Sequence, residues 1–268
     1  MNDQEQIVSA LNAPDEDARW KIVQSLHLRG TRDAFELAAR LCTSANASER
    51  RLGADLLGQL GTPAFPYKDE SVPVLLGMLE AERDASVLNA VAIALGHLKD
   101  PVAIEPLAKL KTHPDSEVRF GVTFGLLGYE NDMAISALVE LSRDTDTDVR
   151  NWATFGLGSL VEADTPLIRD ALAERLDDSD KETRIEAIAG LSIRRDERAL
   201  HPLLAELSSE DVWLTAIDAA GELADTRLCA VLERLLSRSS ESGMEWQNAV
   251  STALAACGCD IAAHGPHT

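Results

Sequence analysis

The sequence predicts an all-α solenoid, a superhelical stack of about seven to eight helix pairs. Three observations predict it. One segment recurs along the 268 residues, and its two clearest copies begin at Asp115 and Asp146, 31 residues apart. The apolar residues within each copy follow helical spacing. A second amphipathic helical segment lies between successive copies. Because neither helix could bury its apolar stripe alone, stacked pairs are the expected fold.

The copies begin with residues that cap helix N-termini. Such a side chain accepts a hydrogen bond from a backbone amide that the helix leaves unpaired. The first residues of the seven clear copies are Asp15, Asn46, Asp84, Asp115, Asp146, Asp180 and Ser209. A degenerate eighth copy is expected over residues 241–258. In the copy at Asp146 the apolar stripe consists of Val149, Trp152, Ala153, Gly156, Leu157 and Leu160.

The second helix of each pair is expected between these copies. It is predicted over residues 103–110, 133–141, 167–176, 199–207 and 227–236. Residues 61–73 hold three prolines where the interval between copies is longest, so they are predicted as an inserted loop. We therefore expect one repeat domain over residues 1–260 and a flexible C-terminal tail over residues 261–268.

The recurring pattern D-x-x-V-R-x-x-A-x-x-x-L-G resembles HEAT repeats. It is most similar to the short form found in bacterial HEAT-like proteins and in phycobilin lyases. The resemblance covers about residues 13–258 and implies that this segment is the inner helix of each pair, lining a concave face. It leaves the function open, because such solenoids host many roles. The residues that carry it are Asp115, Val118, Arg119, Leu126 and Gly128, then Asp146, Val149, Arg150, Ala153, Leu157 and Gly158.

Known enzymes with HEAT-like folds have characteristic features that can be sought in this sequence. Deoxyhypusine hydroxylases hold a di-iron site with adjacent His-Glu pairs, but none of the six histidines here precedes a glutamate. HEAT-like alkylpurine DNA glycosylases use a basic groove, which a formal net charge of −20 opposes. No nucleophile–base pair, phosphate loop or dinucleotide motif is present. We expect no enzymatic activity and no cofactor, with a phycobilin-lyase activity left open.

The charge also bears on partners and location. With 45 acidic and 25 basic residues, the chain should be repelled by nucleic acids and by anionic membranes, so neither is expected as a partner. The N-terminal residues do not follow a signal-peptide pattern, and no apolar run reaches the roughly 18 residues that span a bilayer. The four cysteines do not suggest an extracellular disulfide framework. We expect a cytoplasmic protein.

The inner helices are expected to expose apolar side chains. Counting from Val118 or its equivalent as position 0, positions 0, 4, 7 and 11 face the core, while positions 2, 5 and 9, with 6 beside them, face away. Large apolar residues there are typical of an interaction surface. The hypothesis is a concave groove that binds a protein partner, and the alternative is that the rings pack between repeats. The anchors would be Trp20, Phe120, Phe124, Phe155, Ile185 and Trp213.

An arginine recurs once per repeat, at Arg19, Arg50, Arg119, Arg150 and Arg184. Each lies near its own capping residue and another acidic residue. The favoured interpretation is a structural ladder of ion pairs and hydrogen bonds between repeats, which sets their register. A basic ladder that binds an acidic ligand is the alternative.

No metal site is expected. The acidic runs at residues 15–18, 144–148 and 177–182 lack the glycine and terminal glutamate of a calcium loop, so they are predicted to cap helices and form an acidic ridge. Cys257 and Cys259 lie near His264 and His267, but not at a recognised zinc spacing. Cys42 and Cys229 lie on apolar stripes and are predicted as small core residues.

The sequence therefore predicts a non-catalytic protein–protein interaction module, a scaffold, adaptor or inhibitor, that binds a partner on its concave face. A basic partner would suit the charge. One alternative is an acidic immunity or antagonist protein that neutralises a basic toxin. The other is a lyase-like enzyme that acts on a ligand held in the groove, such as a bilin.

Overall fold

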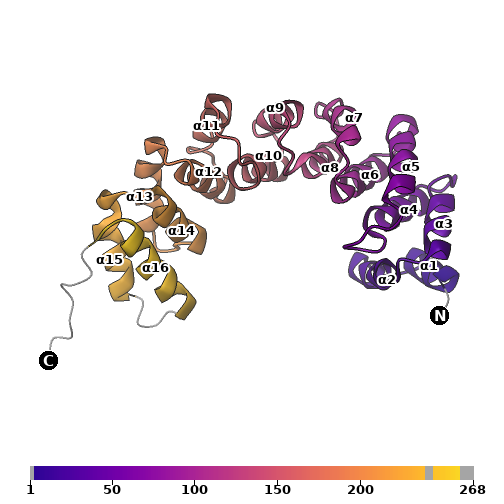
Figure 1. Ribbon diagram of the computed structural model, residues 1–268, viewed down its shortest axis with the longest axis horizontal. Coiled ribbons are helices and arrows are strands. Elements are labelled where there is room, and N and C mark those ends of the chain that lie inside the picture. The colour runs from indigo at the N-terminus through magenta and orange to yellow at the C-terminus, as the bar shows by residue number, and fades with distance from the viewer. Residues whose placement is uncertain (1–2, 239–243, 260–268) are drawn as a thin grey trace. The chain divides into compact units, whose positions relative to one another are not determined.

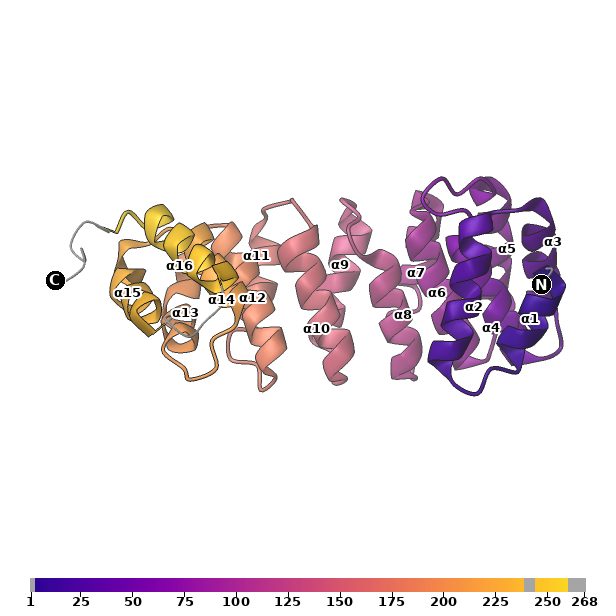
Figure 2. The same cartoon turned by 90° about the horizontal axis from the view of Figure 1, so that it is seen from below.

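The computed structural model describes residues 3–238 and 244–259, and within these ranges it contains helices and no strand. Two compact units meet between Leu141 and Ser142. Within each unit the helices form two layers, which we call the inner and the outer layer (Figures 1 and 2). The expected all-α solenoid is thereby confirmed. The predicted tail at residues 261–268 lies outside the described residues.

The first unit stacks four helix pairs behind the N-terminal helix α1 (Asp3–Leu11), which packs against α2. Its inner layer contains α2 (Glu16–Arg29), α4 (Ala47–Gln59), α6 (Ala85–Leu98) and α8 (Ser116–Leu126). Its outer layer contains α3 (Arg32–Leu41), α5 (Lys68–Ala81), the short helices η1 (Pro101–Ala103) and α7 (Ile104–Ala108), and α9 (Asp132–Leu141).

The second unit repeats this arrangement. Its inner layer contains α10 (Thr147–Phe155), which continues as the π-helix η2 (Gly156–Leu160), then α12 (Lys181–Ile193), α14 (Leu214–Leu223) and α16 (Met244–Ala256). Its outer layer contains α11 (Pro166–Ala173), η3 (Glu197–Ala199) with α13 (Leu200–Leu207), and η4 (Thr226–Leu228) with α15 (Cys229–Arg238).

The capping residues begin the inner helices as the sequence predicts, with one exception. The side chain of Asp84, for example, accepts hydrogen bonds from the amides of Ser86 and Val87. Ser209, however, does not cap the seventh helix. That helix begins at Leu214, after Trp213, whose side chain makes no capping hydrogen bond. The prediction for Ser209 is wrong because the chain runs through an irregular connection before α14 starts.

The predicted loop at residues 61–73 is shorter in the structure. The connection runs only to Tyr67, and α5 begins at Lys68. Two carboxylates, Asp69 and Glu70, lie in the first turn of α5, where negative charge stabilises the helix dipole. Buried Val72 and Leu75 then anchor the helix in the core. The apolar stripe therefore extends the helix across a segment whose prolines suggested a loop.

Neighbouring inner helices approach each other at small residues. The glycine of the Leu-Gly signature lies at position 9, where it meets position 7 of the next inner helix. A Cβ atom added at Gly96 would lie 2.8 Å from the Cα atom of Gly125, and one at Gly190 would lie 2.5 Å from the Cα atom of Gly158. Real side chains do not tolerate such distances. The signature glycine is therefore a packing requirement of the stacked helices.

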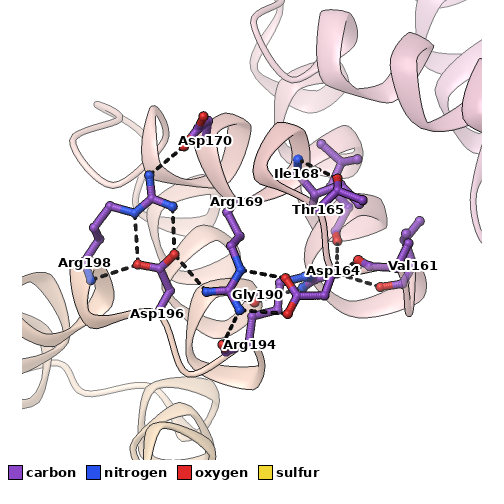
Figure 3. Close-up of polar contacts among 12 residues, drawn as sticks. Val161, Asp164, Thr165, Ile168, Arg169, Asp170, Gly190, Arg194, Asp196 and Arg198 are labelled. Carbon is purple, nitrogen blue, oxygen red and sulfur yellow. Dashed lines mark hydrogen bonds and ion pairs between the residues drawn. The ribbon is translucent and has the colours of Figure 1, made fainter.

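A buried arginine also joins two repeats of the second unit (Figure 3). The Arg194 side chain, only 8% exposed, donates hydrogen bonds to the carbonyls of Gly190, Leu157, Gly158, Val161 and Ala163 at 2.7–3.2 Å. Four of these carbonyls belong to η2 and the residues after it. Helix ends leave carbonyls unpaired, and Arg194 supplies the missing donors.

Ion pairs surround this arginine on the side of the outer layer (Figure 3). Arg169 pairs with Asp164 at 2.6 Å and with Asp196 at 3.1 Å. Arg198 pairs with the same Asp196 at 2.7 Å. The two guanidinium groups hold the pKa of Asp196 well below its usual range, with the Arg198 hydrogen bond as the largest cause. This network fixes α11 against the connection between α12 and α13.

The cysteines differ from the sequence prediction. Cys229 is not a core thiol but forms a disulfide with Cys259, 30 residues later, and so ties the start of α15 to the chain after α16. Cys42 is buried with a free thiol, as is Cys257. Because disulfides persist mainly in oxidising compartments, this bond argues against the expected cytoplasmic location. No helix within the described ranges is long and apolar enough to cross a membrane.

Candidate protein-binding face

In each unit the inner helices have one face that the outer layer does not cover, which we call the open face. Its side chains come from positions 2, 6 and 10. The prediction that positions 5 and 9 also lie on this face is wrong. Thr123, Thr154 and Ile188, all at position 5, are buried. An inner helix packs against its outer partner and against an inner helix on either side. The uncovered side of an inner helix such as α8 is therefore not directly opposite the buried Val118 but is rotated from that side around the helix axis.

On the first unit, three predicted anchors contribute to the open face. Trp20 on α2 is 39% exposed. Phe120 and Phe124 on α8 are half-buried. The ring of Phe124 meets the imidazole of His97 edge to face, with 5.3 Å between ring centres. These aromatic side chains are thus partly packed against neighbours and partly accessible. The structure agrees in part with the predicted groove and in part with the alternative that the rings pack between repeats.

On the second unit the predicted anchors differ. Phe155 is half-buried and meets Trp152 edge to face at 5.7 Å. Ile185 is only 2% exposed, so it is a core residue and its assignment to the partner-binding set is corrected; α12 packs against α10 on one side and α14 on the other. Trp213 precedes α14, and the ammonium group of Lys181 lies 4.9 Å from its ring centre. Trp152, which the sequence predicted as part of the apolar stripe of its helix, is instead 36% exposed.

The recurring arginines contact the chain itself. The Arg50 guanidinium donates to both carboxylate oxygens of Glu82, at 2.6 and 3.0 Å, and to the carbonyls of Ser44 and Ala45. Arg150 binds Asp178 in the same two-pronged way, at 2.7 and 3.0 Å. Each arginine thereby joins the loop before its own helix to an acidic residue of the following repeat. Such paired hydrogen bonds fix orientation as well as contributing energy.

The other three arginines vary this arrangement. Arg184 donates to the carbonyls of Asp178 and Ser179 and reaches Glu206 at 3.4 Å. Arg119 donates to the carbonyls of His113 and Pro114. Arg19 instead pairs with Asp55 at 2.7 Å, on the open face of the first unit. The contacts of Arg19, Arg50, Arg150 and Arg184 match a structural ladder between repeats, and they engage the guanidinium groups that an acidic ligand would need.

The Arg50–Glu82 pair predicts how stability depends on pH. The Arg50 hydrogen bond, with backbone amides, lowers the pKa of Glu82 from 4.5 to about 2. Its stabilising effect is present above pH 4.5 and is lost as the pH falls towards 2. Glu82→Gln should lower the free energy of unfolding by about 1.5–3 kcal/mol at pH 7. In urea titrations, the difference from the wild type should shrink across that interval.

The exposed Glu80 provides the matched control, one helical position before the end of α5. Glu80→Gln should change stability by less than about 0.5 kcal/mol at any pH in this range. A Glu82→Gln difference that stays constant from pH 7 to pH 2 would contradict the role given to the ion pair.

Comparison with known proteins identifies the family to which this architecture belongs. The sequence profile of HEAT repeats matches residues 43–127 and 135–214. The chain belongs to the HEAT-repeat family. Protein YibA of Escherichia coli (strain K12) is 33% identical over 223 residues, which are 81% of this chain and 79% of YibA.

Solved HEAT structures agree with this assignment. The X-ray structure of E. coli YibA superposes with a TM-score of 0.75 at 30% identity, covering 94% of this chain and 92% of YibA. The complex of CpcE and CpcF of phycocyanin lyase from Nostoc sp. PCC7120 superposes with a TM-score of 0.51 at 18% identity, covering 83% of this chain and 94% of that chain. At that identity the likeness to the lyase concerns the fold alone.

The inner helices of the second unit carry acidic groups on or beside their open face. α14 and α16 contain no lysine or arginine. Burial, followed by the negative charge of Glu182, raises the pKa of Glu186 on α12. Partial burial and then the charge of Glu245 raise the pKa of Asp218 on α14. In both cases burial is the larger cause and a like-charged neighbour adds to it, so a cation bound here would favour the charged carboxylates.

No group of three or more metal-ligating side chains occurs in the part of the chain that the structure describes. Cys259 is held in its disulfide, while His264 and His267 lie outside the described residues. Two histidines lie near the open face. His27 is buried, and His97 contacts Phe124. Their positions 9 and 10 in the repeat indicated no more than hydrogen bonds to neighbouring backbone groups.

Proposed function

We propose that this HEAT-repeat protein is a non-catalytic binding module that holds a partner protein on the open face of its inner helices. The observation that carries the proposal is the presence of large aromatic side chains at positions 2 and 6 that neither layer of helices fully covers: Trp20, Phe120 and Phe124 on the first unit and Phe155 on the second. Aromatic anchors contribute much of the binding energy in protein interfaces. A scaffold, adaptor or inhibitor fits this surface.

The charge supports a basic partner. The chain carries a formal net charge of −20, and like-charged neighbours, Glu182 and Glu245, add to the effect of burial on the pKa values of Glu186 and Asp218. Complementary charge accelerates association and makes it sensitive to salt. The same observation favours a second candidate, an immunity or antagonist protein that neutralises a basic toxin. A lyase-like activity has only the likeness in fold to support it.

A capture experiment with matched variants tests the proposal. The double variant Phe120→Ser/Phe124→Ser should bind the partner captured by the wild type at least tenfold more weakly, because two anchors are lost. Its free energy of unfolding should fall by less than the roughly 3–5 kcal/mol that a fully buried phenylalanine costs. Mass spectrometry identifies the partner, and calorimetry at two salt concentrations measures the affinity.

The outer layer supplies the control. Val102 is 55% exposed and lies in η1 of the outer layer, not on the open face of the inner helices. Val102→Ser should therefore leave the affinity for the partner unchanged. A partner that binds the double variant as tightly as the wild type would refute the open face as the binding site. So would a double variant that loses as much stability as a core truncation.

A further inference from the structure

The open face of the first unit contains a pocket of about 210 Å³ that spans three inner helices. Trp20 of α2 forms one wall, Asp55 and Gln59 of α4 form the middle, and Ile93 and His97 of α6 form the opposite wall. The pocket therefore combines an aromatic ring and an aliphatic surface with polar groups. Its volume suits a single large side chain rather than a cofactor.

His27 occupies a position of the repeat that is small in the next two inner helices. It lies at position 9 of α2, where α4 and α6 carry the glycines Gly58 and Gly96. A Cβ atom added at Gly58 would lie 2.6 Å from the Cα atom of Ala94, so this position faces the next inner helix. The backbone carbonyl of His27 accepts a hydrogen bond from the amide of Gly61 at 2.8 Å, which holds the end of α2 against the end of α4.

The imidazole of His27 has an unused hydrogen-bonding atom. The side chain is 5% exposed and hydrogen-bonds to the backbone carbonyl of Asp55. Its Nε2 atom has no hydrogen-bond partner, so the bond to Asp55 is made by Nδ1–H. Burial lowers the pKa of His27 to about 4, and the ring is neutral at pH 7. Nε2 is thus a buried acceptor without a donor, which is costly unless a ligand supplies one.

This acceptor lies next to the walls of the pocket. The indole of Trp20 meets the His27 ring edge to face, with 5.9 Å between ring centres. His97 lies near enough on the other side for its charge to contribute to the lowered pKa of His27. Trp20 is 39% exposed, and exposed side chains change rotamer within nanoseconds. His27 itself does not line the pocket, so a group in the pocket reaches Nε2 only if the indole turns.

We propose that this pocket receives a tyrosine side chain of the partner protein, with its ring against Trp20 and Ile93 and its hydroxyl donating to Nε2 of His27. The inference rests on the proposed function, because it assigns an anchor to the same open face. A lysine or arginine fits less well: Asp55 is already paired with Arg19, and Arg51 also lines the pocket. A phenylalanine would leave Nε2 without a donor.

Titration of the full chain with N-acetyl-tyrosinamide and N-acetyl-phenylalaninamide tests the proposal. The tyrosine probe should bind roughly tenfold more tightly, which corresponds to one additional hydrogen bond. With ¹⁵N-labelled histidine, the Nε2 resonance of His27 should shift with the tyrosine probe and stay in place with the phenylalanine probe. This resonance reports the hydrogen bond itself, whereas stacking on Trp20 would affect both probes alike.

Three variants complete the test. Trp20→Ala, at a partly exposed wall, should weaken the binding of both probes alike, while Trp152→Ala, at an exposed tryptophan of the second unit, should leave both affinities unchanged. His27→Leu should remove the tenfold preference, and the His27 resonance of the wild type answers the question if His27→Leu does not fold. Equal affinities for the two probes, or binding without a shift at His27, would overturn the proposal. Capture of the partner that depends on Phe120 and Phe124 would then still stand, so the two failures are distinguishable.

Discussion

Arg194→Met is expected to lower the free energy of unfolding by about 3–5 kcal/mol, since it removes a buried charged donor and leaves its acceptors unpaired. Arg194 donates to five carbonyls, four of them in η2 and the residues that follow it. Water cannot replace these donors while the site stays buried. Methionine keeps most of the volume of the aliphatic stem, so the loss reports mainly on the hydrogen bonds.

The measurement should resolve local as well as global stability, because repeat proteins do not always unfold in one step. Urea unfolding followed by circular dichroism gives the overall loss. Hydrogen exchange should show the largest loss of protection in α10, η2 and α12, the helices that Arg194 joins. Arg194→Lys should fall between the wild type and Arg194→Met, because an ammonium group cannot reach so many carbonyls at once.

The adjacent Arg195 is an exposed residue of the same charge and provides the control. Arg195→Met should change the free energy of unfolding by less than about 0.5 kcal/mol. Similar losses for the two variants would mean that net charge, and not the carbonyl cluster, accounts for the effect of Arg194.

The fold could be predicted from the sequence because its signals are local. A capping residue such as Asp84 or Asp146 acts within three residues, and helical periodicity acts within one helix. The stacking of pairs then follows from the apolar stripes. The prediction fails in two connections. Ser209 does not cap α14 because an irregular connection follows it, and the segment after Tyr67 is helical because Val72 and Leu75 enter the core.

The candidate site was predictable only in part, for a related reason. Periodicity shows which side of a helix is apolar, but not how many neighbours cover it. Thr123 at position 5 is buried by an adjacent inner helix, and Ile185 at position 2 is buried as well, while the longer Phe120 remains half-exposed. Contacts across repeats carry no spacing rule in the sequence, so the carbonyl cluster of Arg194 and the disulfide of Cys229 could not have been found.

Gly190→Ala is expected to destabilise the protein by about 1–3 kcal/mol, although alanine is the better helix former by about 1 kcal/mol. The added methyl group would lie 2.5 Å from the Cα atom of Gly158, so α12 and η2 would have to move apart. Backbone atoms cannot turn aside as a flexible side chain can. The separation would also disturb the hydrogen bonds of Arg194 to Gly158 and Gly190, and urea unfolding should report the sum of both effects.

The same substitution at Gly77 separates the steric effect of the added methyl group from its effect on backbone entropy. Gly77 lies within α5 of the outer layer, and a Cβ atom added there has no other atom within 4 Å. Gly77→Ala should therefore stabilise the protein by about 0.5–1 kcal/mol through backbone entropy alone. The two variants make an identical chemical change in a helix and are expected to have opposite signs. If Gly190→Ala were also stabilising, close contact between the inner helices could not be the reason for glycine in the repeat.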